Sequence, residues 1–246
     1  MENSAPAPVA PENAYGPSAL IHNGDPLSHG VLLVLVLGSF FSWYILLTKL
    51  WDQYKLAKSY KQVQKVFWTS PSLKDGVEKL QKGDAYRAIV EDGMRAAAHH
   101  DGRLTDRIDL HEWITLSLQR SVANVNGTLQ SGLAFLATVG STAPFVGLFG
   151  TVVGIIKALI AIGVSGQPSI DRVAGPVGEA LIMTAIGLIV AVPAVLSYNW
   201  LLSRNKGLQE DLRNFAADVH AYLVGGARVS ASPAAAPAAA PAAVRK

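Results

Sequence analysis

The chain has 246 residues, of which 50% are hydrophobic and 16% are charged, and its mean hydropathy is +0.28. Soluble domains carry roughly 25% charged residues, so this composition favours a membrane protein over one large soluble core. The net charge is only +3 and the basic residues stand beside apolar segments, which argues against a nucleic-acid partner. The sequence contains no cysteine, which excludes disulfides and thiolate metal sites.

The N-terminal 28 residues are rich in Pro, Ala and Asn and contain three acidic residues but no Lys or Arg. We expect a disordered tail, and because a secretory signal peptide needs a basic start, we expect the next segment to be retained. That segment, Val31–Leu50, has the ~20 apolar residues that cross a ~30 Å hydrocarbon core. Lysines follow it and none precedes it, so the N-terminus is expected outside the cytoplasm.

A stretch of mixed charge follows, from Asp52 to about Asn126, with apolar residues at helical spacing. Breaks are expected near Pro71, Gly83 and Gly102, because these residue types interrupt helices. The stretch is predicted to form a helical domain in the cytoplasm.

No charged residue occurs between Arg120 and Lys157, a run too long for one perpendicular span. We expect its polar early part to continue the helix on the cytoplasmic side and the second span to begin near Leu133. The turn-forming residues of Gly163–Arg172 predict a short outer loop. Val173–Leu202 is the third span, and the basic residues after it place the following segment in the cytoplasm.

The sequence therefore predicts an all-α integral membrane protein with three transmembrane helices and a helical cytoplasmic domain. The Pro/Ala repeat at the C-terminus favours extended conformations over a packed core. The expected parts are a disordered periplasmic tail (1–28), transmembrane helices (29–50, 131–160 and 173–202), a cytoplasmic helical domain (51–130), a periplasmic loop (161–172), a cytoplasmic helix (203–226) and a disordered Pro/Ala-rich tail (227–246).

Glu179 is the one acidic residue inside the three apolar segments. A charged side chain at the centre of a bilayer costs roughly 2.5–3.5 kcal/mol, so such residues usually face a protein interior or water. Counted from Asp171 at 1.5 Å per residue, Glu179 lies about 12 Å along the helix, in the outer third of the span. It is either a functional carboxylate or an interfacial residue, and we favour the functional interpretation.

Two threonines accompany Glu179. If Lys157 and Arg172 mark the outer ends of a hairpin of the second and third spans, Thr151 and Glu179 should lie at similar depth. Thr184 is rotated by about 140° from Glu179, so both border one pore only if the helix lies between two grooves. A hydroxyl beside a carboxyl can serve a proton relay. The alternative for each threonine is a packing hydroxyl bonded to its own i−4 carbonyl.

Small residues recur at intervals of three and four in both spans, which lets helix backbones approach closely in lipid. This pattern predicts oligomerisation or tight packing of the hairpin. The prolines Pro144 and Pro193 each remove a backbone hydrogen bond and are expected to kink their spans. The segment GLFGTVVG lacks the Gly-Lys-Ser/Thr end of a phosphate-binding loop and is not interpreted as one. The small residues are Gly147, Gly150 and Gly154 in the second span and Gly175, Gly178, Ala180, Thr184, Gly187 and Ala191 in the third.

Catalytic and metal-binding motifs are weak. His99, His100 and Asp101 could ligate a metal, but adjacent positions do not converge on a helix, so we expect solvent exposure. No nucleophile, base and orienting partner assemble into a recognisable set. We therefore expect neither an enzyme nor a bound cofactor.

Two long motifs resemble one family. ATVGSTAPFVGLFGTVVGI (Ala137–Ile155) and GEALIMTAIGLIVAVPAVLSYN (Gly178–Asn199) are similar to the ExbB/TolQ/MotA proton-channel family. The order STAPF before GLFGTV is more similar to its ExbB branch than to its TolQ branch. The strong resemblance covers residues 133–200, and the topology extends it to about residue 225. Val153 and Met183 depart from the family pattern, which commonly has Trp and Ala there, and these departures concern packing against lipid or partners.

The resemblance implies an inner-membrane complex of Gram-negative bacteria, in which a homo-oligomeric ring, expected to be a pentamer, surrounds the membrane helices of ExbD. The ExbD-like partner is a single-span protein with a membrane-embedded Asp. Such a complex is a molecular motor that uses the proton motive force to energise TonB for uptake of iron-siderophores and cobalamin. The family's proton-pathway glutamate falls on Glu179 and its pore threonines on Thr151 and Thr184, while Pro144 and Gly147 match its pore-wall motif.

Other functions remain open from the sequence. A TolQ-type subunit of the Tol-Pal system shares the family, and a non-conducting membrane scaffold would carry Glu179 for structural reasons. A self-contained secondary transporter is disfavoured, because three spans without an inverted repeat do not enclose a substrate site.

Overall fold

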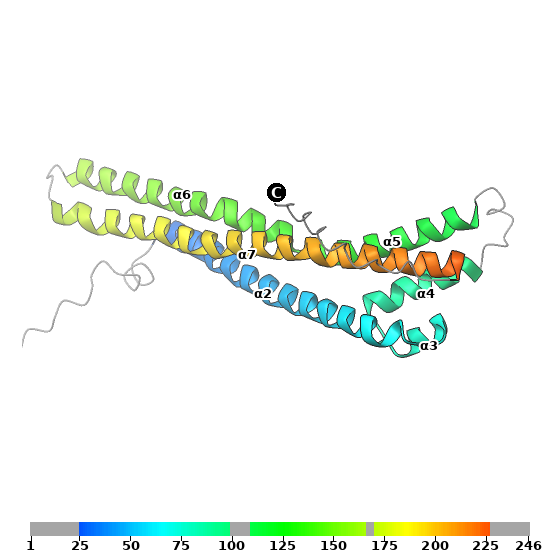
Figure 1. Cartoon of the computed structure of the whole chain (residues 1–246). Helices are drawn as coiled ribbons and strands as arrows, with labels where there is room; N and C mark the ends of the chain where they lie inside the picture. The colour runs from blue at the N-terminus through cyan, green and yellow to red at the C-terminus, as the bar shows by residue number, and fades with distance from the viewer. Residues whose placement is uncertain (1–24, 99–108, 166–169, 227–246) are drawn as a thin grey trace, which may run out of the picture. The chain divides into compact units, whose positions relative to one another are not determined.

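The computed structural model describes residues 25–98, 109–165 and 170–226, and every regular element among them is helical (Figure 1). Three of the described helical segments are long and apolar enough to cross a membrane. The predicted all-α class with three such helices is confirmed. The elements are α2 (Pro26–Gln62), the π-helical segment η1 (Val63–Phe67), α3 (Leu73–Glu78), α4 (Ala85–Ala98), α5 (Leu110–Gln130), α6 (Leu133–Ser165) and α7 (Ile170–Gly225).

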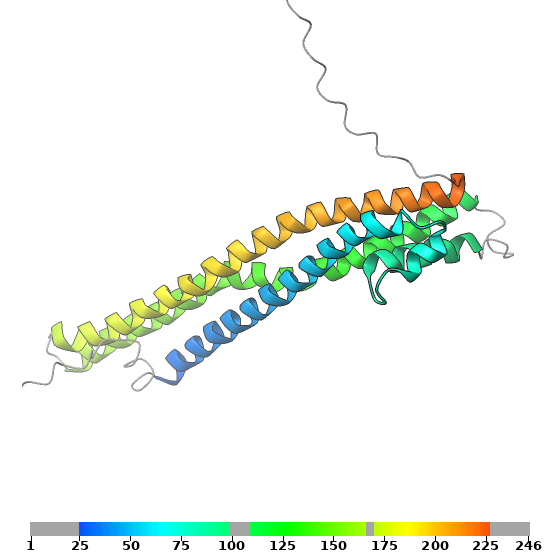
Figure 2. The same ribbon diagram turned by 60° about the horizontal axis from the view of Figure 1, so that its bottom comes forward.

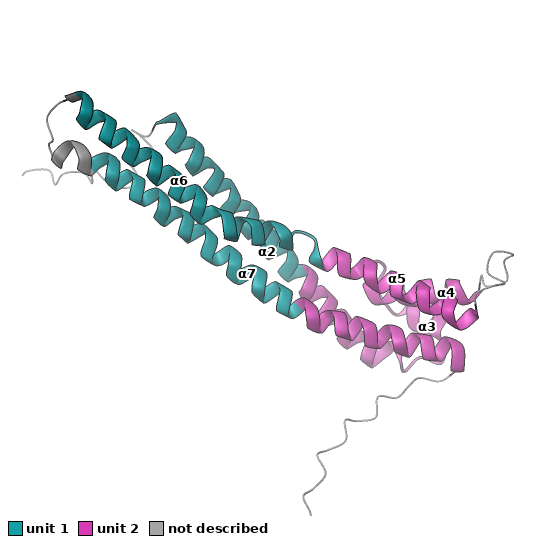
Figure 3. Ribbon diagram, turned by 90° about the horizontal axis from the view of Figure 1, so that it is seen from above, with its two compact units in different colours: residues 1–51, 130–204 teal, residues 52–129, 205–246 magenta. Residues whose placement is uncertain are grey.

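The chain divides into two compact units, drawn in different colours in Figure 3. Unit 1 comprises residues 1–51 and 130–204, and unit 2 comprises residues 52–129 and 205–246. Unit 1 therefore contains the first part of α2, all of α6 and the first part of α7. Unit 2 contains the remainder of α2 and α7 together with η1, α3, α4 and α5.

The helix ends differ from several predicted boundaries. The first helix begins at Pro26, where proline suits the first turn, so three residues assigned to the tail are helical. It continues to residue 62 without a break at 50, and α7 joins the third span and the cytoplasmic helix in one 56-residue element. A change of solvent along a helix does not interrupt its i→i−4 hydrogen bonds, so a membrane boundary need not end it. The tails 1–24 and 227–246 lie outside the described residues.

The polar stretch SVANVNGTLQ is helical as expected, and α6 begins at Leu133, but a turn separates α5 from α6, so the helix is not continuous into the second span. The turn contains Ser131 and Gly132, and Gly132 has a φ of +80°. Other residue types rarely adopt this left-handed conformation, which explains why the helix stops at a glycine. Gly83, with a φ of +84°, lies between α3 and α4, Pro71 lies between η1 and α3, and Gly102 is outside the described residues.

Unit 1 packs α2, α6 and α7 together and leaves many large apolar side chains uncovered. Leu35 and Met183 are 2% and 1% exposed in one cluster, and Leu136 and Leu201 are fully buried in another. In contrast, Phe145 and Ile189 are each 70% exposed, and Leu196 is 65% exposed. Apolar faces of this extent need lipid or protein to cover them, as expected for a membrane unit.

Unit 2 has the core of a water-soluble helical domain. Tyr86 of α4 is fully buried, and its ring meets that of Phe215 of α7 edge to face, with centroids 5.1 Å apart. Both Val63 and Phe67 of η1 are also buried in this core. Burial raises the pKa of Tyr86, with a further contribution from the charge of Asp211.

Buried amide groups tie three helices of unit 2 together. Gln53 of α2 donates from Nε2 to Oδ1 of Asn205 on α7, at 2.7 Å, and Asn205 Nδ2 donates to the carbonyl oxygen of Leu129 on α5, at 3.1 Å. Gln53 and Asn205 are each 1% exposed. A buried hydrogen bond is costly to break when one partner is left unpaired, so Asn205 specifies how α2, α5 and α7 pack here.

We expect Asn205→Ala to lower the free energy of unfolding by about 2–3 kcal/mol, because it removes both bonds and leaves the Leu129 carbonyl without this donor. The measurement is thermal unfolding of the purified protein in detergent. Asn214→Ala, at an exposed position of α7, is the matched control and should leave the midpoint nearly unchanged. Equal midpoints for the two variants would contradict this role of Asn205.

Candidate functional site

Helices α6 and α7 lie side by side in unit 1 along a line of small residues (Figures 1 and 2). A Cβ placed on Gly147 would lie 2.7 Å from the carbonyl oxygen of Met183, and one on Gly187 would lie 2.7 Å from that of Ala143. Real side chains do not approach backbone atoms so closely, so both positions require glycine in this packing. The two backbones are therefore in direct contact, and we call this contact the α6–α7 seam.

The other glycines of the two spans do not all contribute to the seam. A Cβ on Gly154 would lie 2.8 Å from the Cβ of Ala180, and one on Gly150 would lie 3.2 Å from the Cβ of Met183. Gly178 has no neighbouring atom within 4 Å of such a Cβ, so it is not needed for packing within this part of the chain. The small-residue pattern thus serves close packing of α6 against α7 inside one chain at most of the positions that the sequence singled out.

The two prolines lie inside the helices of the seam. Pro144 is in α6, directly after Ala143, whose carbonyl faces Gly187. Pro193 is in α7, directly before the buried Ala194. Each removes one helical N–H donor, which leaves a carbonyl one turn earlier without its usual partner. Pro144 lies at the contact of α6 with α7, whereas Pro193 lines a small pocket with Ser42 and Trp43 of α2.

The seam brings Thr151 and Thr184 together. Thr151 is 7% exposed, and its Oγ1 is hydrogen-bonded to Oγ1 of Thr184 across the two helices. Thr151 Oγ1 also lies 3.0 Å from the carbonyl oxygen of Ala180 and 3.2 Å from that of Gly147. The bond to Gly147 lies within α6 and is the i−4 bond expected of a threonine that only packs. The other two bonds join Thr151 to α7.

A hydroxyl has only one proton to donate, which limits the possible directions of these bonds. If Thr184 donates to Thr151, then Thr151 donates to one of two carbonyls, that of Ala180 on α7 or that of Gly147 on α6. In the first case a short chain of hydroxyls runs from Thr184 through Thr151 to the Ala180 carbonyl. Ala180 is the i−4 residue of Thr184, so one carbonyl serves both its own helix and the opposite one.

Glu179 directly precedes Ala180 in the sequence but takes no part in these hydrogen bonds. It is half-buried and makes no hydrogen bond or ion pair with the described residues. It precedes Ala180 and lies one turn before the buried Met183, with which it shares a helix face. Its carboxyl group is not bonded to either threonine and is available to water, to another subunit or to a partner.

The sequence reasoning missed two features around the site. The Ala180 carbonyl accepts the Thr151 hydroxyl, and the only available signal was its i−4 spacing from Thr184. Lys157, used above only to mark a helix end, forms an ion pair with Asp25 at the start of α2. The side chains of both are exposed, so the pair is worth little to stability.

The described residues contain no cluster of three side chains that could hold a metal ion. His99, His100 and Asp101 lie outside them. The seam offers two hydroxyls between apolar helices, and α7 carries the carboxyl group of Glu179 in the same span. Such groups can hold, pass or release protons.

The three apolar helices are those of a helical membrane protein, and its spans carry a carboxyl group and hydroxyls, which are groups able to exchange protons. Residues 81–214, which include α5 and α6 and most of α7, match the family described as the MotA/TolQ/ExbB proton channel family. The chain belongs to this family.

Curated relatives extend the match over most of the chain. The biopolymer transport protein ExbB of Xanthomonas campestris is 41% identical over 208 residues, covering 81% of this chain and 82% of that protein. The ExbB protein of Neisseria meningitidis is 38% identical over 210 residues, covering 83% and 96%. The Tol-Pal system protein TolQ of Pseudomonas aeruginosa is 31% identical over 210 residues, covering 83% and 91%. The chain is thus similar to both branches of the family.

We expect Gly147→Ala to destabilise the α6–α7 seam by about 1–3 kcal/mol, because the added methyl group would meet the Met183 carbonyl and push the helices apart. The measurement is resistance of the detergent-purified protein to unfolding by SDS. Gly178→Ala, with open space around it, is the matched control and should unfold as the parent does. If both variants unfold alike, the seam does not limit stability.

Proposed function

We propose that this chain is the ring-forming, proton-conducting subunit of an inner-membrane motor that energises a TonB-like protein for uptake of iron-siderophores and cobalamin. The observation that carries the proposal is Glu179, the one acidic residue in the apolar spans, half-buried and without a partner among the described residues. Membership of a proton channel family and similarity to proteins named ExbB support this choice.

In this mechanism Glu179 binds a proton from the outer side and releases it toward the cytoplasm. A protonated carboxyl is neutral and tolerates an apolar contact, whereas the carboxylate needs water or a positive or hydrogen-bonding partner. The Thr184–Thr151 hydroxyl chain ends on the carbonyl of Ala180, next to Glu179, and would position water or pass a proton there. Protonation of Glu179 would thus favour an apolar neighbour, and deprotonation would favour water or a polar partner.

The partner that fits this mechanism is an ExbD-like single-span helix with a membrane-embedded Asp, held inside a homo-oligomeric ring, proposed as a pentamer. Approach of two carboxyl groups favours protonation of one of them, which couples proton binding to helix movement. The apolar faces left exposed by Phe145 and Ile189 would be covered by lipid or by neighbouring subunits. The proposed orientation places the N-terminus in the periplasm and the C-terminus in the cytoplasm.

We expect Glu179→Gln to abolish siderophore-dependent growth on scarce iron and proton flux into liposomes that contain the chain and its partner. The glutamine keeps the size of the side chain but cannot exchange a proton. Glu210→Gln, at an exposed position outside the apolar spans, is the matched control and should retain both activities. Normal growth and flux with Glu179→Gln at normal protein level would refute the role of this carboxyl.

We expect Thr151→Val to reduce proton flux strongly, because valine has the same shape but cannot bond to Thr184 or to the Ala180 carbonyl. Thr151→Ser keeps the hydroxyl and should retain most of the flux. The liposome assay is paired with thermal unfolding, so that a packing defect can be recognised. Equal flux for the two variants at equal stability would leave Thr151 a packing residue only.

The TolQ-type function is the second candidate, because a TolQ relative is 31% identical over most of its length. The deletion phenotype separates the two functions. Loss of siderophore use supports the proposal, whereas detergent sensitivity with intact iron uptake assigns the chain to the Tol-Pal system. A non-conducting scaffold would show no flux that depends on Glu179.

A further inference from the structure

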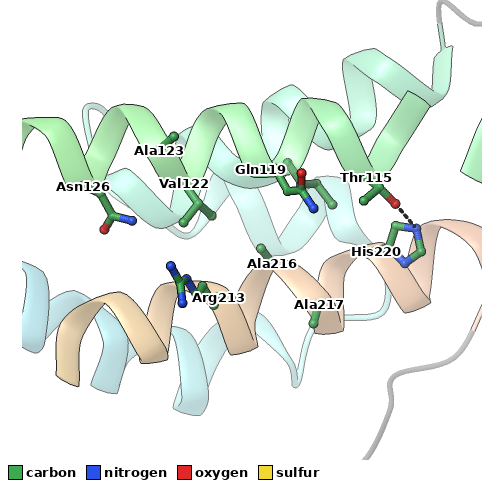
Figure 4. A pocket seen from close by; sticks show the side chains of 10 residues that line it. Thr115, Gln119, Val122, Ala123, Asn126, Arg213, Ala216, Ala217 and His220 are labelled. Carbon is green, nitrogen blue, oxygen red and sulfur yellow. Dashed lines mark hydrogen bonds between the residues drawn. The ribbon is translucent and has the colours of Figure 1, made fainter. Parts of the chain in front are cut away.

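Helix α7 borders a pocket in each unit. In unit 2 a pocket of about 540 Å³ lies between α5 and α7 (Figure 4). The polar side chains that line it, such as Gln119 and Arg213, are exposed, so water can pair with them. In unit 1 a smaller pocket lies between α2 and α7, within the apolar part of both helices. Its polar groups face a region from which lipid excludes bulk water.

Three serines line the pocket of unit 1. Ser39 and Ser42 belong to α2, and Ser197 belongs to α7. At 1.5 Å per residue, Ser42 lies about 10 Å before Lys49 and Ser197 about 10 Å before Arg204, which are the next charged residues along each helix. The three hydroxyls therefore lie inside the hydrocarbon layer and not at its surface.

The hydrogen bonds of these serines are incomplete. Ser42 Oγ donates to the carbonyl oxygen of Gly38 on its own helix, at 2.7 Å. Ser39 and Ser197 make no hydrogen bond with the described residues, neither with each other nor with the carbonyl four residues earlier. An unpaired hydroxyl in hydrocarbon is unfavourable, because no solvent there can replace the missing bond. The two hydroxyls therefore need a partner that lies between the helices.

The α7 wall and the size of the pocket indicate which partner fits. Pro193 lines the pocket and has no N–H, so the carbonyl oxygen of Ile189, four residues earlier, lacks its helical donor. The volume of the pocket is about 10 Å³, roughly the least that admits one water molecule. Such a space is too small for a side chain of another helix, but a water molecule fits and can both donate and accept.

We propose that one water molecule binds between α2 and α7 and bridges the three serines. The hydroxyls of Ser39 and Ser197 donate to the water oxygen. The water donates one proton to Ser42 Oγ, whose own proton is already used within α2, and the other to the Ile189 carbonyl. Buried waters typically make about three hydrogen bonds, so this site is well furnished. The water thus replaces the donor that Pro193 removes and joins α7 to α2 beside the proline.

The lack of cysteine makes the proposal testable, because an introduced thiol has a unique S–H stretching band. Ser197→Cys places the thiol in the pocket lining. Leu196→Cys, at the adjacent position, where the side chain is 65% exposed, places it outside the pocket at nearly the same depth. The full-length chain in liposomes is transferred into heavy water, and infrared spectroscopy follows the replacement of S–H by S–D.

We expect the thiol of Ser197→Cys to exchange at least about tenfold faster than that of Leu196→Cys, because exchange needs contact with water and hydrocarbon disfavours the thiolate. Adding Ser39→Val fills the pocket with apolar atoms and should slow exchange at Ser197→Cys at least about tenfold. Ser141→Val, the same change at an exposed position of α6, is the matched control and should alter exchange less than about twofold.

Two results would overturn the proposal. Equal exchange for Ser197→Cys and Leu196→Cys would mean that the pocket holds no water. Fast exchange that Ser39→Val leaves unchanged would mean that water reaches α7 without the serine site. If Ser39→Val lowers the midpoint of thermal unfolding, Ser39→Ala takes its place, because alanine removes the same hydrogen bond without added bulk and should also slow exchange. None of these outcomes bears on Glu179, so the two proposals are tested independently.

Discussion

The backbone contact between α6 and α7 is the constraint on which the rest of unit 1 depends. Gly147 and Gly187 each face a carbonyl oxygen of the opposite helix at a distance that excludes a side chain. Only at this separation can the short hydroxyl of Thr151 reach the Ala180 carbonyl on α7. Because lipid provides no hydrophobic drive for helix association, this contact relies on dispersion between closely packed atoms. The same small residues that allow packing therefore also assemble the polar groups of the site.

The two units follow opposite rules of solvation along the same helices. Unit 1 directs large apolar side chains such as Phe145 and Ile189 outward, whereas unit 2 buries Tyr86 and Phe215 and exposes charge. Asn205 lies in unit 2, where its buried amide accepts a hydrogen bond from Gln53 and donates one to the carbonyl of Leu129. A single helix such as α7 can continue from lipid into water because its backbone hydrogen bonds are formed within the helix in both environments.

Much of the fold could be predicted from the sequence, because long apolar segments and their basic flanks are strong local signals. Glu179 was found as the one acid in those segments, and Thr151 by counting residues from the helix ends. Counting gives depth but not rotation, so the pairing of Thr151 with Thr184 could not be predicted. The pocket between α5 and α7 was missed for a similar reason, since its lining residues come together only when the two helices pack (Figure 4). Continuity of α7 was missed because a change in hydropathy was taken to mark a helix end.

The π-helical segment η1 has a consequence for how the long first helix ends. Its hydrogen bonds span five residues, so its turn is wider than that of the α-helix before it. Val63 and Phe67 are both buried there, and residues 68–72 after the segment are not helical. Because the helix ends on buried side chains, its last turn is held by the core of unit 2 and does not fray as an exposed helix end would.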